Sequence, residues 1–100
     1  MKFYLLEGHH LMSFEHIPSA LIDAHHQFLQ SGYDDGHFLF SGPQQPPHGG
    51  FLVARAVSRQ QLDALLAEEP FVREGVMEFS AITEFEAAQC QPFLNEWFGK

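Results

Sequence analysis

Two apolar runs flank a loop of Gly, Pro, Gln and His in the middle of the chain, and this arrangement constrains the fold most. The runs are residues 37–41 and 51–57, and the loop is residues 42–50. Proline stiffens such a loop and glycine permits positive φ angles, so we interpret the two runs as strands of one antiparallel hairpin. In the first strand, alternation places Phe38 and Phe40 on one face.

Before the hairpin, the sequence predicts one strand and one helix. Residues 2–8 are aromatic and aliphatic, which favours a short strand that ends at Gly8. A polar connector rich in histidine follows. Residues 18–31 then carry apolar side chains at helical spacing, and Gly32 suits the position just after a helix.

After the hairpin, a second helix and a last strand are expected. Ser58 and Gln61 have the spacing of a capping box, in which each side chain bonds the backbone of the first turn. Pro70 disfavours helix at the preceding residue, so this helix should end at Glu69. Residues 76–85 form the fourth strand, with four side chains predicted on one face: Met77, Phe79, Ala81 and Phe85.

The resulting order is strand, helix, strand, strand, helix, strand. Right-handed crossovers then predict an α+β fold, the ferredoxin-like βαββαβ plait, with a four-stranded antiparallel sheet and both helices on one face. Because the strands are apolar on both faces, the open face should also be covered. We expect a homodimer with packed sheet faces (a dimeric α/β barrel), or cover by the C-terminal tail.

The whole chain, residues 1–100, is predicted to be a single domain with a core over about residues 1–85. Residues 86–100 are an aromatic extension. Phe93, Leu94, Trp97 and Phe98 lie on one face of a helical turn, and exposed together they would form a costly apolar patch. We therefore expect them to be buried on the sheet or on a second subunit.

Charge and cysteine content exclude several classes of function. The chain has 13 acidic and 5 basic residues and a net charge of −8, so it offers no basic surface for nucleic acid. No apolar run approaches the length of a membrane span, and we expect no membrane partner. The single Cys90 excludes an internal disulfide framework and favours a reducing, cytoplasmic location.

Three residues are candidates for a functional site. His25 lies inside the apolar stripe of the first helix, where partial burial could tune a general acid or base, although a packed core histidine is the structural alternative. Glu69 could serve a site, pair with Arg73 or simply end a helix. Ser41 ends a strand beside Gly42, a position that often lines pockets and often only turns the chain.

The seven histidines do not indicate a specific metal site. Adjacent pairs such as His9-His10 and His25-His26 do not converge on one ion, and no zinc-type spacing or second cysteine is present. His16 with His9 or His10 is the remaining metal alternative. We expect neither a metal nor an organic cofactor.

Several short stretches together resemble the YCII-related family of small bacterial proteins, over roughly residues 1–85. The stretches are Ala24-His-His-Gln-Phe-Leu29, Ser41-Gly-Pro43, Gly49-Gly50, Ala56-Val-Ser58 and Glu69-Pro-Phe-Val-Arg-Glu-Gly-Val76. The resemblance implies the dimeric α/β-barrel fold and a His–Asp dyad in a pocket. The histidine maps onto His25 and the aspartate onto Glu69, where this chain has a carboxylate one methylene longer.

The resemblance implies an enzyme acting on a small cyclic or aromatic molecule by proton transfer, with isomerisation or elimination. One similar branch eliminates chloride from a chlorinated hydroxyhydroquinone. His25 would transfer the proton, Glu69 would orient it, and Ser41 would offer a hydroxyl, with Phe28, Phe40 and Phe71 as apolar walls. The alternative is a non-catalytic dimeric binding or interaction module, which predicts a fully packed His25 and no open pocket.

Overall fold

The structure, a computed structural model that describes residues 1–100, is built on one antiparallel sheet of four strands. The strands are β1 (Lys2–His10), β2 (Phe38–Pro43), β3 (Gly49–Ala56) and β4 (Met77–Phe85), and they lie in the order β2-β3-β1-β4. All three neighbouring pairs are antiparallel. With a helical crossover in each half, this order confirms the predicted ferredoxin-like plait.

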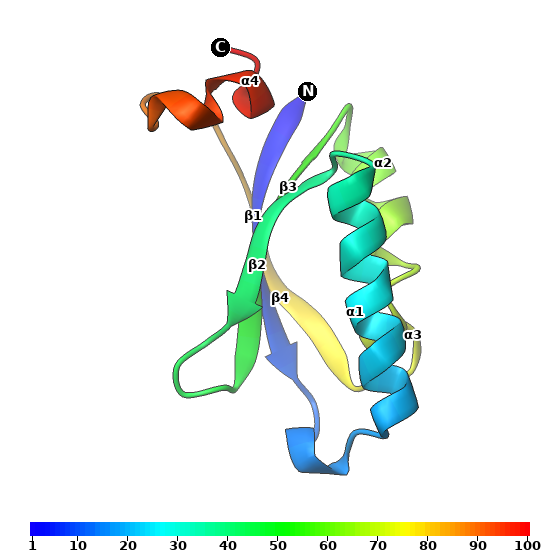
Figure 1. The fold of residues 1–100 in the computed structure, drawn as a ribbon. Coiled ribbons are helices and arrows are strands. Elements are labelled where there is room, and N and C mark those ends of the chain that lie inside the picture. The colour runs from blue at the N-terminus through cyan, green and yellow to red at the C-terminus, as the bar shows by residue number, and fades with distance from the viewer.

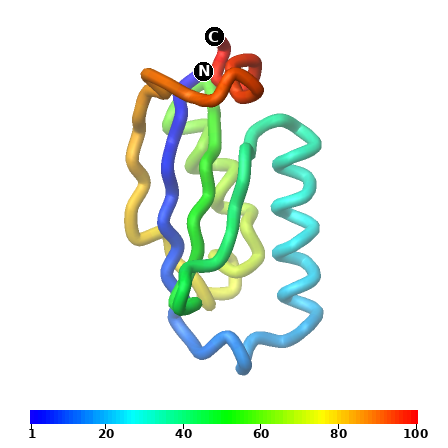
Figure 2. The backbone as a smooth tube through the Cα atoms, turned by 60° about the vertical axis from the view of Figure 1, so that its left-hand side comes forward, coloured from blue at the N-terminus to red at the C-terminus, as the bar shows by residue number.

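Three helices cover one face of the sheet (Figures 1 and 2). They are α1 (Ser19–Asp34), α2 (Arg59–Leu66) and the single turn α3 (Pro70–Arg73). The main core lies between them and the sheet, and its buried members are Tyr4, Leu6, Phe38, Leu52, Ala54, Ala56, Leu62 and Leu66. The other sheet face carries no helix. No helix combines the length and apolar character that crossing a membrane requires.

Strand β1 is longer than predicted. Gly8 does not end it, because Gly8 pairs with Gly50 and His9 pairs with Gly49 in β3. A Cβ atom on Gly49 would lie 1.8 Å from the carbonyl oxygen of Gly8, so glycine permits this close approach of the two strands. The strand therefore continues to His10, before the short 3-10 turn η1 (Phe14–His16).

A bulge in β2 corrects the predicted facing of its phenylalanines. Phe38 pairs with Ala54 while Phe40 pairs with Val53, so β2 holds one residue more than β3 over this stretch. An extra residue reverses the alternation that follows it. Phe38 is accordingly buried under the helices, whereas Phe40 is on the open face and 54% exposed.

A second bulge divides the predicted apolar face of β4. Gly8 pairs with Phe79 and Glu7 pairs with Ala81, which leaves Ser80 as the extra residue. Met77 and Phe79 therefore face the helices and pack in the core, while Ala81 is exposed. The prediction of one common face is wrong because the alternation changes at the bulge.

The sequence predicts that this helix ends at Ser31, just before Gly32, but α1 continues to Asp34. Gly32 is buried inside the helix because the ring of Phe38 lies directly on it; a Cβ there would be 2.0 Å from that ring. Gly36, with φ of +80°, supplies the left-handed conformation just after the helix.

The predicted N-terminus of α2 is confirmed, but its C-terminus is not. The Gln61 backbone N–H donates to Ser58 Oγ at 3.1 Å, as a capping box requires. The Gln61 side chain accepts from the N–H of Val57 rather than from that of Ser58. The helix ends at Leu66 instead of Glu69.

The C-terminal extension docks at one end of the sheet, through η2 (Pro92–Leu94) and α4 (Asn95–Phe98) (Figure 1). The ring of Phe98 lies 5.0 Å from that of Phe3, and Arg55 lies 4.7 Å above the ring of Trp97. Arg55 also donates to the Trp97 carbonyl. The expected burial holds partly: Trp97 and Phe98 are half-buried, but Phe93 is 80% exposed in the single chain.

Candidate functional site

His25 lies on the side of α1 that faces the sheet, and its side chain is 19% exposed. Its Nδ1 atom is 2.6 Å from Oε1 of Glu69. Because a carboxylate only accepts hydrogen bonds, we assign the proton to Nδ1, which donates to Glu69. Nε2 of the neutral ring is then a free acceptor, and no protein atom bonds it. The two residues, 44 positions apart in sequence, thus meet in one hydrogen bond.

Glu69 is almost completely buried, with 1% of its surface exposed. It is the N-cap residue of α3, and its carboxylate accepts from the backbone N–H of Phe71 at 3.2 Å and of Val72 at 3.1 Å. These donors and His25 compensate the cost of burying the carboxylate. The possible pairing of Glu69 with Arg73 is not made, because Arg73 points to the exposed Glu68 instead.

Phe71 fixes the plane of the His25 ring. The two rings stack with centroids 4.0 Å apart and planes 5° apart. Phe71 is itself buried, in a small core cluster with Ile17, Val76 and Met77. Stacking on one side and the bond to Glu69 at one edge hold the imidazole in a single orientation, which a proton-transfer residue needs.

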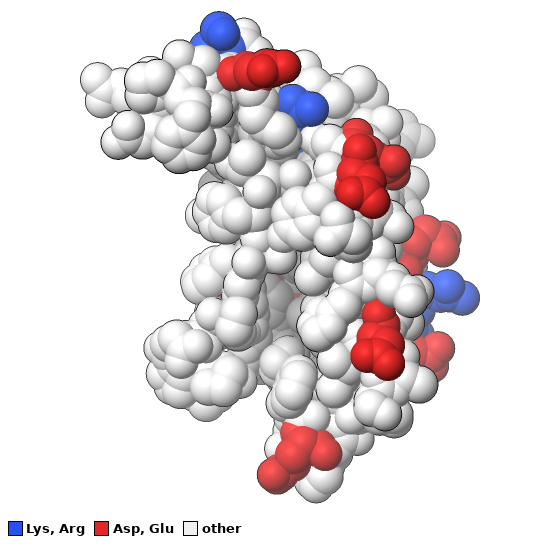
Figure 3. Space-filling model, in the orientation of Figure 1, with Lys and Arg blue, Asp and Glu red and all other residues white.

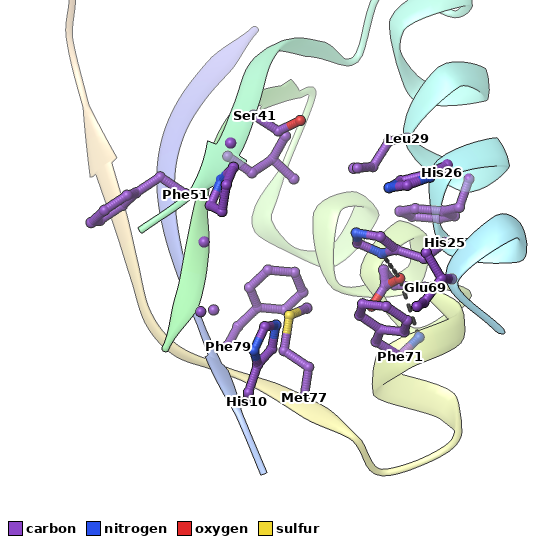
Figure 4. A pocket seen from close by; sticks show the side chains of 18 of the residues that line it. His10, His25, His26, Leu29, Ser41, Phe51, Glu69, Phe71, Met77 and Phe79 are labelled. Carbon is purple, nitrogen blue, oxygen red and sulfur yellow. Dashed lines mark hydrogen bonds and ion pairs between the residues drawn. The ribbon is translucent and has the colours of Figure 1, made fainter. Parts of the chain in front are cut away.

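A cavity of about 380 Å³ lies beside this pair, between α1, α3 and the sheet. Gly8, Gly49 and Gly50 line it from the sheet strands β1 and β3. His25, Glu69 and Phe71 lie together on the helix side (Figure 4). The molecule is hollowed at this place, and the Lys, Arg, Asp and Glu side chains on that side lie mostly away from the hollow (Figure 3). The cavity is therefore suited to a small, largely apolar molecule with a few polar groups.

Ser41 lines the same cavity from the sheet side. It pairs with Leu52, which is buried under the helices, and the bulge in β2 is what turns it to this face. Its hydroxyl shares a short hydrogen bond with Tyr33 of α1. Of the three predicted apolar walls, Phe28 and Phe71 line the cavity, but Phe40 does not, since the bulge turns it to the open face.

His10 also lines the cavity, and the sequence analysis missed it. The sequence pattern predicts a connector at this position, whereas His10 is the last residue of β1. Alternation from Tyr4 and Leu6 through Gly8 would have found it, had Gly8 not been taken as the end of the strand. Partial burial, followed by the charges of His25 and His9, lowers the pKa of His10 below its ordinary value of 6.5.

The histidines of the connector do not gather around a common point with other metal-binding side chains. No group of three or more His, Cys, Asp or Glu side chains lies close enough together to hold an ion.

Fold and cavity define an α+β protein of ferredoxin-like topology with a buried histidine–carboxylate pair facing a small-molecule-sized hollow. A sequence model of the YCII-related domain matches residues 1–86. The chain belongs to the YCII-related family, as its short motifs indicated. No curated protein matches its sequence.

Among solved structures, the chain is similar to 5-chloro-2-hydroxyhydroquinone dehydrochlorinase (TftG) from Burkholderia phenoliruptrix AC1100, in complex with 2,5-dihydroxybenzoquinone. The TM-score is 0.57 and the sequence identity 19%, over 85% of this chain and 91% of that one. At this identity the similarity establishes a shared fold.

Proposed function

We propose that this protein is an enzyme that transfers a proton on a small cyclic or aromatic molecule, with elimination or isomerisation. The observation that carries the proposal is the hydrogen bond between His25 and the buried Glu69 in the wall of a cavity. An imidazole with one nitrogen held by a carboxylate and the other free is the arrangement of a general base.

In the proposed reaction, Nε2 of His25 accepts a proton from a hydroxyl or carbon of the substrate. The released electron pair forms a new double bond. In an elimination, an anionic leaving group departs with the electron pair of its bond to the ring. In an isomerisation, His25 returns the proton to another atom. Glu69 stabilises the imidazolium that forms and keeps the proton on Nδ1.

Ser41 is proposed to bind the substrate rather than to attack it. Its hydroxyl is already paired with Tyr33, and a paired hydroxyl retains the capacity for a second bond. Accepting from Tyr33 leaves Ser41 its own proton to donate, and donating to Tyr33 leaves it a lone pair. In either arrangement it can contact an oxygen of the ligand.

The similar structure suggests the class of substrate. Its enzyme is a dehydrochlorinase of a hydroxyhydroquinone and holds a dihydroxybenzoquinone. A flat ring of that size suits a cavity of about 380 Å³ bordered by Phe28, Phe71 and Phe79. We therefore propose hydroxylated six-membered rings, with or without a halogen leaving group, as the substrates.

The test has a binding part and a turnover part. We expect calorimetric titration to show that the protein binds 2,5-dihydroxybenzoquinone. We also expect chloride release from 5-chloro-2-hydroxyhydroquinone under anaerobic conditions. His25→Gln and His25→Ala should slow the release by about a hundredfold or more, because a general base contributes that much. His16→Gln, a change at an exposed histidine outside the cavity, is the control.

Glu69→Gln should also slow turnover while leaving the size of the side chain unchanged. Glu69→Asp tests whether the additional methylene matters, since aspartate is the residue expected there from the family resemblance. Lack of chloride release by the wild-type protein would exclude this substrate class. Equal turnover in wild type and His25→Gln would exclude the role of His25.

The rival function, a binding module without catalysis, predicted a fully packed His25 and no open pocket. The 19% exposure of the His25 side chain and the cavity beside it favour the enzyme instead. Catalysis by His25, Glu69 and Ser41 is thus the function that the geometry supports best.

We also propose that the protein is a homodimer whose open sheet faces pack together. Three large apolar side chains support this, because they are exposed on that face in the single chain: Leu5 at 42%, Phe40 at 54% and Phe51 at 40%. In this proposal residues 1–85 form the domain and residues 86–100 an extension of it. The single Cys90, which is free, suits a reducing compartment such as the cytoplasm.

A further inference from the structure

The ring nitrogens of His10 make no hydrogen bond within the protein. Its ring packs 5.9 Å from that of Phe14 and edge-on to Phe71, with centroids 6.4 Å apart. Nδ1 of His25 and Nδ1 of His37 each have a protein partner, but neither ring nitrogen of His10 has one. A half-buried imidazole without partners, in the wall of a cavity, is free to bond a ligand.

His10 and His25 approach the cavity from different layers of the fold. His25 comes from α1, beside Glu69, whereas His10 comes from β1, beside Met77 and Phe79 (Figure 4). Both imidazoles contact the same phenyl ring, that of Phe71. A single ring-sized ligand in the cavity can therefore contact one histidine on each side.

The charge state of His10 suits a different role from that of His25. Burial lowers the pKa of His10, and the charges of His25 and His9 lower it further. Its imidazole is therefore neutral near pH 7 and offers one N–H donor and one acceptor. The positive charge that His25 carries after it takes up a proton from the substrate is one of these causes, and it disfavours protonation of His10. His10 thus remains a neutral hydrogen-bonding group during the reaction.

We propose that His10 is a second substrate-binding residue, which hydrogen-bonds an oxygen on the side of the ring away from the group that His25 deprotonates. The inference rests on the proposed function and sharpens its substrate class. The preferred ligands are flat rings that carry oxygen substituents on two opposite sides. A ring with oxygen on one side only should bind less tightly.

The experiment compares the binding of 2,5-dihydroxybenzoquinone, the probe named above, by wild type, His10→Phe, His10→Gln and His25→Gln. Phenylalanine preserves the aromatic packing on Phe14 and Phe71 but removes both nitrogens. We expect His10→Phe to raise Kd about fivefold, the effect of one lost hydrogen bond. His9→Gln is the matched control, because His9 is the exposed neighbour in β1 and does not line this cavity.

A second measurement is insensitive to packing. In two-bond ¹H–¹⁵N spectra of the wild-type imidazoles, the ring nitrogens of His10 should shift when the probe is added, and those of His16 should not. Unchanged Kd in His10→Phe with unchanged His10 shifts would overturn this inference, while weakened binding by His25→Gln would leave the proposed function standing. A wild-type protein that does not bind the probe would overturn both.

Discussion

Glu69 combines a structural and a chemical task in one carboxylate. It caps α3 through the backbone of Phe71 and Val72, and it holds Nδ1 of His25. Because the same oxygen, Oε1, contacts both His25 and the N–H of Phe71, the position of the histidine is tied to the start of α3. The residue that orients the proposed base is therefore also one that stabilises the fold.

This double role predicts a large loss of stability on removal of the carboxylate. Glu69→Ala leaves two backbone N–H groups and one imidazole N–H without partners in a buried site. The free energy of unfolding should fall by about 2–4 kcal/mol. Glu68→Ala, at the exposed neighbour, should change it by less than about 0.5 kcal/mol. Urea denaturation followed by circular dichroism measures both, and equal effects of the two changes would contradict the capping role.

At the scale of the element, the absence of a side chain at Gly32 allows α1 to pack closely on the sheet. The ring of Phe38 occupies the space where a side chain at Gly32 would be. This contact brings the helix that carries His25 close to β2, which carries Ser41. The paired hydroxyls of Tyr33 and Ser41 join the same two elements.

Gly32→Ala should therefore destabilise the protein, although alanine favours helix over glycine by about 1 kcal/mol. The new methyl group would meet the Phe38 ring at 2.0 Å, and overpacking of this kind costs about 1–3 kcal/mol. Ser31→Ala, at an exposed position of the same helix, should be neutral or slightly stabilising. Thermal unfolding compares the two variants, and a higher Tm for Gly32→Ala would refute the close contact.

At the scale of the whole molecule, the helices leave one sheet face uncovered, and the proposed dimer gives that face a partner. Phe40→Glu places a charge on the open sheet face, within the proposed interface. In multi-angle light scattering, the Phe40→Glu variant should have the molar mass of one chain, whereas the wild-type protein should have the molar mass of two chains. Val57→Glu, which changes an exposed apolar residue outside the strands, should leave the mass unchanged. A monomeric wild type at micromolar concentration would contradict the proposal.

The order of the elements, the sheet class and the N-terminus of α2 follow from the sequence by itself. They depend on local properties: the spacing of apolar residues in a helix or strand, and a capping box within one turn. For the same reason, the apolar stripe of α1 was enough to place His25 on the side that faces the sheet. The family motifs then indicated that His25 and Glu69 belong together.

Only the tertiary structure decided which side chains enter the cavity. The bulge in β2 turns Ser41 inward and Phe40 outward, and the continuation of β1 past Gly8 brings His10 to the cavity wall. Bulges and strand ends depend on the pairing with a neighbouring strand far away in sequence, which residue patterns within one strand do not contain. Glu69 is buried for a similar reason, because the donors and the histidine that surround its charge come together only in the folded chain.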